Sequence, residues 1–415
     1  FKAKYGEMRY SNANKILAGE FVRQLWSNTD MRAKDVAMHY PMAVELCLTP
    51  LQGAVDAARY SRYAAVVDRR RAVDSPKLGC LAELRGVTTG VDRTGDSNLR
   101  PLNNSVRKTT RERVVRYFAG IGAGVRYGVH CSNIKNLARG VVERVFYVQR
   151  NGSLTRAPQP LAGVFTRLSG VRKRLLGAVR STPVVARADY PGLYVGRKRG
   201  IYQRAYDSLM IRAVNRRDAW VNTFVKAEKV NLSAKGDPAP RVIQPRSPRY
   251  NLEVGRYLKL FEKELYKGFA RVWGYPVVLK GLNAHEVGAQ LAAHWGAFAR
   301  PAAVGLDASR FDQHTSRAAL EWEHSVYNAV FRSSELARLL SWQLQNHGVA
   351  RVEGYRVDYD IEGCRMSGDI NTGLGNCLLM SSMVIAYCEE GGIPFRLANN
   401  GDDCVLFVEQ DDLHR

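Results

Sequence analysis

The stretch NNGDDCVLF, residues 399–407, places two adjacent aspartates between a turn sequence and an apolar run. An Asn-Gly pair before a β-prone run predicts a hairpin, because both residues tolerate the positive φ values that a type I′ turn requires. Two interpretations of Asp402 and Asp403 are open at this point. A solvated acidic pair at a hairpin tip is the commoner arrangement, and carboxylates directed at a metal ion are the other.

A strand upstream of this hairpin ends in a third aspartate. AAVGLD predicts a short strand that ends at Asp307, and Asp312 follows beyond a turn in GLDASRFDQ (305–313). The D-x4-D spacing alone is uninformative, but neighbouring strand ends would bring Asp307 and Asp402 together. Clustered carboxylates need a cation, and Mg²⁺ prefers oxygen ligands. The pattern predicts two Mg²⁺ ions, which activate an attacking hydroxyl and stabilise a leaving pyrophosphate.

Between these aspartates lies SGDINTGLGNCLL (367–379), which predicts a loop followed by a helix from near Thr372. Thr372 and Asn376 share one helix face because they are four residues apart. They belong either to a capped helix with a small-residue packing face or to a site that binds a sugar. In the second case Asp312 and Asn376 together could recognise the 2′-hydroxyl that distinguishes RNA from DNA.

The C-terminal part of the chain predicts a mixed α+β fold. Apolar periodicity indicates helices at 252–268, 316–331 and 334–346, and alternation indicates a hairpin at 348–363. The acids of that hairpin, Glu353, Asp358 and Asp360, are expected on its solvated face. Further helices are expected within 11–48, and the turn-rich residues 74–106 are expected to form a linker.

The formal net charge is +23, and residues 107–249 hold 30 Lys or Arg against 7 Asp or Glu, a surplus that accounts for all of it. This surplus predicts a nucleic-acid partner. The segment GRKRGIYQRAYDSL (196–209) combines Arg197, Lys198 and Arg199 with Tyr202. It is either a solvated helix with Tyr202 in the core or a path for single-stranded RNA, where rings stack on bases and arginines contact phosphates.

Other protein classes are disfavoured. The seven cysteines are odd in number and lack a CxxC pair, which argues against a disulfide framework or a zinc site and for a reduced, intracellular chain. No apolar run approaches the roughly 18 residues that span a bilayer. The chain opens on Phe1 rather than Met, so the true N-terminus is expected to lie upstream of it.

The order D-x4-D, SG-x3-T-x3-N and GDD resembles motifs A, B and C of viral RNA-dependent RNA polymerases. FVKAEKVNLSAKGDPAPRVIQPRSPRYNLEVGRYLK (224–259) is similar to motif F in the tombusvirus-like plant virus family, Tombusviridae. The strong resemblance covers residues 190–415. RAKDVAMHYPMAVELCLTP (32–50) is similar to the end of that family's auxiliary replicase protein.

The resemblance implies a right-hand polymerase fold with fingers and a partial palm on a ferredoxin-like core. The implied domains are a helical auxiliary replicase-like region (1–75), a linker (76–106), basic fingers with motif F (107–250) and a palm with motifs A to C (251–415). The chain stops twelve residues after Asp403. Motifs D and E and a thumb are not found in it, so truncation after motif C is expected.

The resemblance also implies roles for individual residues. Asp307, Asp402 and Asp403 would bind the two Mg²⁺ ions, with Mn²⁺ able to substitute, and catalyse the reaction. The nucleotide and its ribose would be bound by Asp312, Ser367, Thr372, Asn376, Lys226, Lys229, Arg241 and Arg246. The four basic and aromatic residues of 196–209 named above would contact RNA.

The implied activity is template-directed RNA synthesis from nucleoside triphosphates for genome replication and transcription. Its partners would be a single-stranded RNA template, the nascent RNA, an auxiliary replicase protein and host membrane factors, with no role for DNA. The expected location is a membrane-associated replication complex in the host cytoplasm. The alternatives are a non-enzymatic RNA-binding viral protein, which leaves the three aspartates unexplained, and a reverse transcriptase, which would select against a 2′-hydroxyl.

Overall fold

The structure, a computed structural model, describes residues 99–103, 127–130, 132–150, 153–231, 234, 238–352 and 355–415. The helices predicted within 11–48, most of the predicted linker and Glu353 lie outside these residues. The chain divides into two compact units. The described part of the smaller unit is 127–130, 132–139, 225–231, 234 and 238–241, and the remaining described residues form the larger unit.

Helices and strands alternate irregularly along the described residues. In chain order the helices are α7 (Ile134–Val141), α8 (Ser169–Ala178), α9 (Gly196–Ile211), α10 (Pro248–Trp273), α11 (Ala284–Trp295), α12 (Phe311–His314), α13 (Arg317–Phe331), α14 (Ser334–Ser341) and α15 (Thr372–Glu390). The strands are β1 (Leu99–Asn103), β2 (Tyr127–Gly128), β3 (Tyr147–Arg150), β4 (Ser153–Arg156), β5 (Val221–Val225), β6 (Val230–Asn231), β7 (Val242–Ile243), β8 (Pro301–Asp307), β9 (Gln345–Val352), β10 (Tyr355–Glu362), β11 (Arg396–Asn399) and β12 (Asp403–Glu409).

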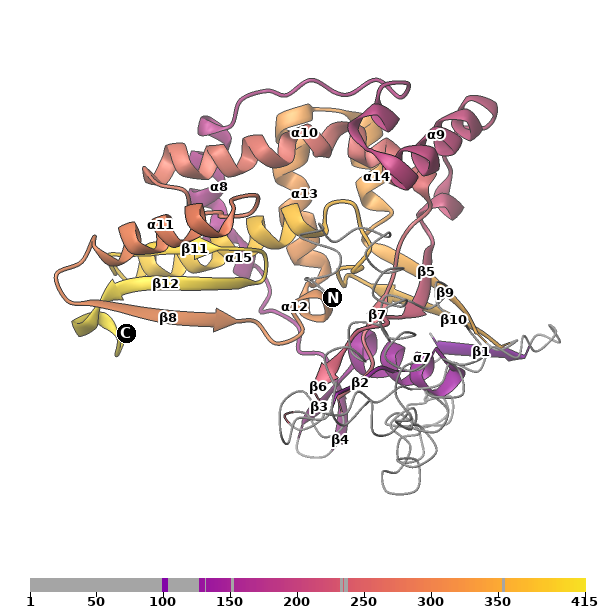
Figure 1. Cartoon of the computed structure of the whole chain (residues 1–415), viewed down its shortest axis with the longest axis horizontal. Helices are drawn as coiled ribbons and strands as arrows, with labels where there is room; N and C mark the ends of the chain where they lie inside the picture. The colour runs from indigo at the N-terminus through magenta and orange to yellow at the C-terminus, as the bar shows by residue number, and fades with distance from the viewer. Residues whose placement is uncertain are drawn as a thin grey trace, which may run out of the picture. The chain divides into compact units, whose positions relative to one another are not determined.

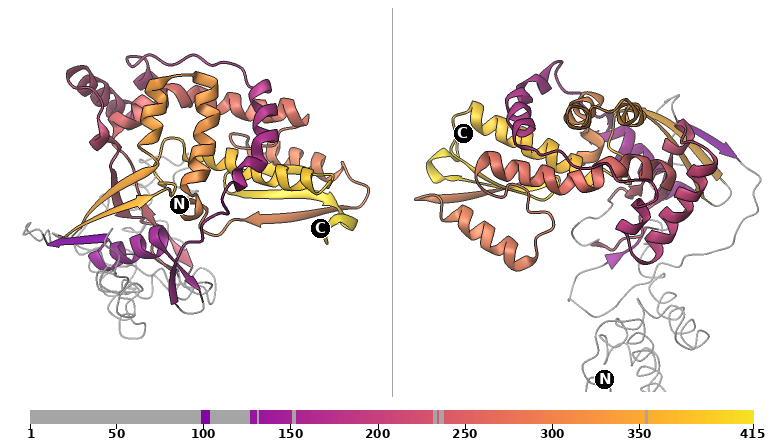
Figure 2. Two further views of the ribbon diagram at one scale, coloured as in Figure 1. Left: turned by 180° about the vertical axis from the view of Figure 1, so that it is seen from behind. Right: turned by 90° about the horizontal axis from the view of Figure 1, so that it is seen from above.

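A three-stranded antiparallel sheet of order β11-β12-β8 lies between helices in the larger unit. Because side chains alternate along a strand, Val405 and Phe407 of β12 pack toward α11, whereas Cys404 and Val408 pack into the main core with α15. Figure 1 and Figure 2 show α11 and α15 along this sheet. The strand predicted to end at Asp307 and the helix predicted near Thr372 are both confirmed.

The long helix α10 organises the rest of the main core. Ser247 caps it, because its Oγ accepts a hydrogen bond from the Arg249 amide (3.1 Å), and Pro248 occupies the first turn. Gly274 ends the helix with a φ of 76°. One face of α10 contacts α8, α9 and α14, as Figure 1 shows. Among the described helices none is long and apolar enough to cross a bilayer.

The second sheet of the larger unit has the order β1-β10-β9-β5-β7. The predicted hairpin at 348–363 is confirmed as β9 and β10. Three expectations were wrong. The helix predicted at 334–346 ends at Ser341, and residues 345 and 346 belong to β9. Leu99–Asn103 is not linker but an edge strand that pairs with β10, and Asp358 is buried rather than solvated, because its carboxylate pairs with Arg356 of the same strand (2.7 Å).

The turn between β11 and β12 also differs from the prediction. Asn399 pairs with Cys404, so four residues (400–403) lie between this pair, and among them only Gly401 has a positive φ, of 106°. A type I′ turn would need positive φ at Asn400 as well. The buried side chain of Asn399 instead holds the turn through two hydrogen bonds. Its amide nitrogen donates to the Gly401 carbonyl (2.8 Å), and its amide oxygen accepts from the Gly401 N–H (3.1 Å).

Candidate active site

Two of the predicted catalytic aspartates face each other across the three-stranded sheet. Asp307 is the last residue of β8, Asp403 is the first of β12, and the two form a cross-strand pair. Both side chains are exposed. Asp402 is the last residue of the preceding turn and is half-buried. The register therefore pairs Asp307 directly with Asp403, and the hydrogen-bonded side chain of Asn399 fixes the turn that carries Asp402.

Asp312 lies on the short helix α12, which follows the left-handed residue Arg310 (φ 53°). Its Oδ1 accepts a hydrogen bond from the Asn376 amide nitrogen (3.1 Å), so the two residues predicted to recognise a ribose do meet. Burial raises the pKa of the Asp312 carboxyl, and the carboxylates of Asp402 and Asp369 raise it further.

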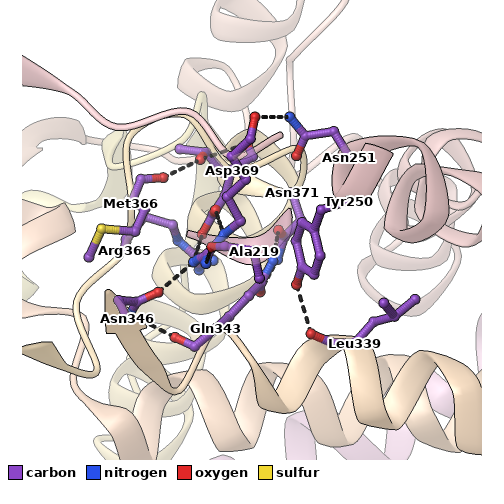
Figure 3. A network of polar contacts seen from close by, with 12 residues as sticks. Ala219, Tyr250, Asn251, Leu339, Gln343, Asn346, Arg365, Met366, Asp369 and Asn371 are labelled. Carbon is purple, nitrogen blue, oxygen red and sulfur yellow. Dashed lines mark hydrogen bonds and ion pairs between the residues drawn. The ribbon is translucent and has the colours of Figure 1, made fainter. Parts of the chain in front are cut away.

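A buried arginine that the sequence analysis missed holds Asn376 in place. Arg365 is 1% exposed, its Nε donates to the Asn376 amide oxygen (3.1 Å), and its guanidinium pairs with the fully buried Glu323. The amide oxygen of Asn376 is thereby engaged, so its nitrogen is the atom turned to Asp312. Gly375 makes room for this pair, since a Cβ there would lie 2.4 Å from the guanidinium. Figure 3 shows Arg365 next to Met366 in the neighbouring polar network that includes Gln343, Asn346 and Asp369.

The hydroxyls of Ser367 and Thr372 are engaged with backbone. Ser367 donates to the Val242 carbonyl (3.1 Å), and Thr372 donates to the carbonyls of Met366 (3.1 Å) and Asp369 (3.0 Å). The hydroxyl protons of both residues thus hold the loop before α15 in shape. Their oxygens remain available only as acceptors.

Arg246 does not lie where the sequence analysis expected it. Its side chain is 1% exposed, and its guanidinium donates to Asp369 (2.5 Å), to the Ala219 carbonyl (2.5 Å) and to Asn346 (2.5 Å). Figure 3 shows Ala219, Asn346 and Asp369 turned toward a common centre. Because the guanidinium is buried and bonded to these three partners, a triphosphate cannot reach it. Arg246 therefore has a structural role.

Comparison with known proteins places the chain in a family. Residues 102–415 match the model of the viral RNA dependent RNA polymerases, and residues 1–53 match that of Tombusvirus p33. The chain belongs to the viral RNA-dependent RNA polymerases. Membership implies a right-hand polymerase fold, with which the mixed helices and sheets agree.

Individual relatives are similar over most of the chain. The RNA-directed RNA polymerase of Turnip crinkle virus is 47% identical over 90% of this chain and 48% of its own length. That of Tobacco necrosis virus (strain D) is 42% identical over 99% and 57%. That of Tomato bushy stunt virus (strain Cherry) is 43% identical over 99% and 50%. The chain thus spans about half the length of the curated relatives it matches.

Three of the residues predicted to bind the triphosphate, Lys226, Lys229 and Arg241, belong to the smaller unit. Lys226 and Arg241 both pair with Glu228 (2.8 and 3.3 Å), and the Lys226 amide donates to the Arg241 carbonyl (2.8 Å). Arg241 and Lys229 are exposed and Lys226 is half-buried. Glu228 therefore draws two of these cations together and offsets part of their charge.

The predicted RNA-binding residues on α9 separate into two groups. Arg197, Lys198 and Arg199 are exposed, so they can reach a phosphate backbone. Tyr202 is 4% exposed and packs against Tyr190 and Tyr194, with ring centroids 5.0 and 4.6 Å apart. Of the two interpretations of Tyr202, the structure supports the core residue.

Lys280 is a second residue that the sequence analysis missed. The backbone of 277–279 bonds to Asn399 at the edge of the three-stranded sheet. This places the Lys280 ammonium 3.8 Å from where a Cβ on Gly401 would lie and 3.2 Å from one on Gly373. A cation thus lies between the aspartate turn and the start of α15. No sequence motif marked it, because only the bridge to Asn399 brings it there.

The carboxylates suit one kind of metal ion. Within the described ranges no group of three or more His, Cys, Asp or Glu side chains is arranged to hold a metal. The donors at the ends of β8 and β12 are instead a facing pair, Asp307 and Asp403, with Asp402 beside them. Mg²⁺ is commonly bound by one or two carboxylates together with waters and substrate phosphates. The donor set fits an ion whose remaining ligands come with the substrate.

Proposed function

We propose that this chain carries the catalytic aspartates of an enzyme that copies an RNA template into RNA from nucleoside triphosphates, for viral genome replication and transcription. The observation that supports it most is the pairing of Asp307 with Asp403, 96 residues apart in the sequence (403 − 307), at adjacent strand ends. Asp402 precedes Asp403 in the chain, and Asp312 accepts a hydrogen bond from Asn376.

In the proposed reaction the 3′-oxygen of an RNA chain bonds to the α-phosphorus of a nucleoside triphosphate, and the bond to the bridging oxygen breaks to release pyrophosphate. Asp307, Asp402 and Asp403 would hold two Mg²⁺ ions, or Mn²⁺ in their place. The ions would supply the charge that activates the hydroxyl and stabilises the leaving group.

The chain's own residues would select and position the nucleotide. Asp312, held by Asn376, would accept a hydrogen bond from a ribose 2′-hydroxyl, and a deoxyribose would leave that acceptor unpaired. The oxygens of Ser367 and Thr372 would accept from the same nucleotide. Lys226, Lys229 and Arg241 would neutralise the triphosphate, and Arg197, Lys198 and Arg199 would contact the RNA backbone.

The proposed partners are a single-stranded RNA template, nascent RNA and nucleoside triphosphates. The match of residues 1–53 to Tombusvirus p33 supports an auxiliary replicase protein as a further partner. Host membrane factors and a membrane-associated replication complex in the host cytoplasm complete the proposal. We further propose fingers within 107–250 and a palm within 251–415.

Primer extension with the full chain tests this function. Asp307→Asn and Asp402→Asn should each lower ribonucleotide incorporation by roughly 100-fold or more, the scale of removing an electrostatic group at a reacting centre, while RNA binding is retained. Asp411→Asn is the matched control, because that carboxylate is 78% exposed and pairs only with Arg300 in the described structure.

Three results would contradict the proposal. Incorporation that survives both substitutions would remove the aspartates from catalysis. If the unsubstituted chain synthesises no RNA and the substitutions reduce only its binding to RNA, a non-enzymatic RNA-binding protein would be favoured. Preferential incorporation of deoxynucleotides would favour a reverse transcriptase.

A further inference from the structure

A cavity of about 280 Å³ opens on the larger unit where β9 begins and β10 ends. We call it the tryptophan pocket. None of the residues proposed above for catalysis or nucleotide binding lines it. Its lining residues are Arg216, Ala219, Trp220, Trp342, Gln345, His347 and Asp360.

The aromatic walls of the tryptophan pocket are held by neighbouring side chains. The ring of His347 lies 4.2 Å from that of Trp220, and its Nδ1 pairs with Asp360 (2.7 Å), which fixes the orientation of the imidazole. Trp342 is flanked by Tyr250 and by the guanidinium of Arg338, 5.1 Å from its ring. Trp220 nevertheless remains 37% exposed. Arg217 also lies over the Trp220 ring, 5.8 Å from its centroid. The pocket therefore presents a partly covered aromatic surface, held in place by its neighbours, to a flat ligand.

The charges of the tryptophan pocket favour an anionic ligand over a cation. Asp360, the only carboxylate among the lining residues, is paired with His347. Arg216 is exposed, and within the described part of the chain it makes no hydrogen bond or ion pair. The exposed amide of Gln345 adds a donor and an acceptor. A flat ring with a negative group beside it matches this lining.

We propose that the tryptophan pocket binds one unpaired nucleotide of a single-stranded RNA. The base would pack against Trp220 and Trp342, its polar edge would meet Gln345, and its phosphate would pair with Arg216. The volume of about 280 Å³ lies just below the roughly 300–1,000 Å³ of small-ligand pockets, so the pocket has room for one nucleotide at most. Stacking on aromatic side chains with arginines on the phosphates is the general way in which proteins bind single strands. The proposal rests on the proposed function, since it assumes that the chain works on RNA.

Photocrosslinking of the full chain to an oligouridylate with 5-iodouracil at one position tests the site. We expect crosslinked peptides that contain Trp220 or Trp342. Arg216→Ala, an exposed substitution that leaves the core intact, and Trp220→Leu, which keeps apolar volume without the ring, should each reduce the crosslink about tenfold. Lys267→Ala removes the same unit of charge from an exposed position on α10 and should leave the crosslink unchanged.

Uridine 5′-monophosphate, which shares the base and the phosphate, distinguishes a strand from a free nucleotide. A crosslink that persists at an equal nucleotide concentration of the monophosphate supports an RNA strand, and its complete displacement would overturn that assignment. Crosslinks confined to peptides outside the pocket, or unchanged in both pocket variants, would overturn the site itself.

The polymerase proposal and the pocket proposal can fail separately in this experiment. Asp307→Asn should abolish primer extension and keep the crosslink. Extension that depends on Asp307 together with no crosslink in the pocket would reject only the pocket. A crosslink in the pocket together with primer extension that is unchanged by Asp307→Asn would reject only the catalytic proposal.

Discussion

Asp312 is placed to bind a substrate, but its buried carboxylate lowers the stability of the folded chain at neutral pH. Its carboxyl accepts a hydrogen bond from Asn376. Burial raises its pKa more than this hydrogen bond and the charge of Arg365 lower it, and the carboxylates of Asp402 and Asp369 add to the rise. A raised pKa means that the native state holds the proton more tightly than the unfolded chain does. The contribution of Asp312 to stability is therefore fully present below its ordinary pKa of about 3.9 and is lost as pH rises through the raised value.

Asp312→Asn should consequently raise the melting temperature at pH 7, because asparagine has no charge to bury. The gain should shrink as pH falls toward about 4, where the native carboxyl is protonated. Thermal unfolding of both chains between pH 4 and pH 8 measures this. The exposed substitution Asp411→Asn serves as the control, and a lower melting temperature for Asp312→Asn at pH 7 would show that the carboxylate stabilises the fold.

Arg365 gives a second prediction at this scale. Arg365→Met should lower the free energy of unfolding by about 3–5 kcal/mol, because it leaves Glu323 buried without its cation. Adding Glu323→Gln should recover most of that loss in urea unfolding. The Asn376 amide also loses the donor that orients it, so the preference for ribonucleotides over deoxynucleotides should fall in the single and the double variant. An unchanged preference would mean that Arg365 only stabilises the fold.

The turn between β11 and β12 decides, at the scale of an element, where Asp402 and Asp403 lie. Gly401 has a φ of 106°, which L side chains rarely adopt, whereas Gly392 has a φ of 61° in open space after α15. Gly401→Ala should therefore cost about 1–3 kcal/mol and also lower primer extension, because the aspartate turn is displaced.

Gly392→Ala provides the matched comparison. It also places a side chain at a positive φ, but Gly392 precedes β11, whereas Gly401 lies in the turn after it that carries Asp402. It should lower the free energy of unfolding in urea by about 1 kcal/mol with little loss of extension. Equal losses of primer extension in the two variants would show that activity does not depend on the geometry of the Gly401 turn.

Element types were predictable from the sequence where periodicity was long, as for α10, α13 and the β9–β10 hairpin. The turn type was not, because the side chain of Asn399 bonds to Gly401 and replaces the expected geometry. The strand Leu99–Asn103 was missed because its partner β10 lies far along the chain. Local pattern carries no information about such a partner.

The same limit applied to individual site residues. The order of the aspartate motifs indicated Asp307, Asp402, Asp403 and Asp312 because those residue types recur at spacings typical of the family. No local signal showed that Arg246 and Arg365 would be buried. Burial of an arginine depends on a carboxylate from elsewhere, Asp369 in one case and Glu323 in the other.

At the scale of the whole molecule, the net charge of +23 predicts binding to RNA that weakens steeply with salt. The logarithm of the affinity for single strands falls with that of the salt concentration by about 0.7 per phosphate contact. Replacing the exposed Arg197, Lys198 and Arg199 by alanine should therefore reduce the slope by about 2. Fluorescence anisotropy across a salt series measures it, with Lys267→Ala as the control. An unchanged slope would show that α9 does not contact RNA.

The pairing of β1 with β10 has a consequence for how the chain is made. Leu99 pairs with Tyr359, which is 260 residues later (359 − 99), and Val221 of β5 pairs with Gly348 of β9. At a ribosomal rate of roughly 5–20 residues per second, the partner of Leu99 emerges about 13–52 s after it. The five-stranded sheet can therefore close only after Tyr359 has been synthesised, and until then its upstream strand has an unpaired edge that must avoid pairing with a neighbouring nascent chain.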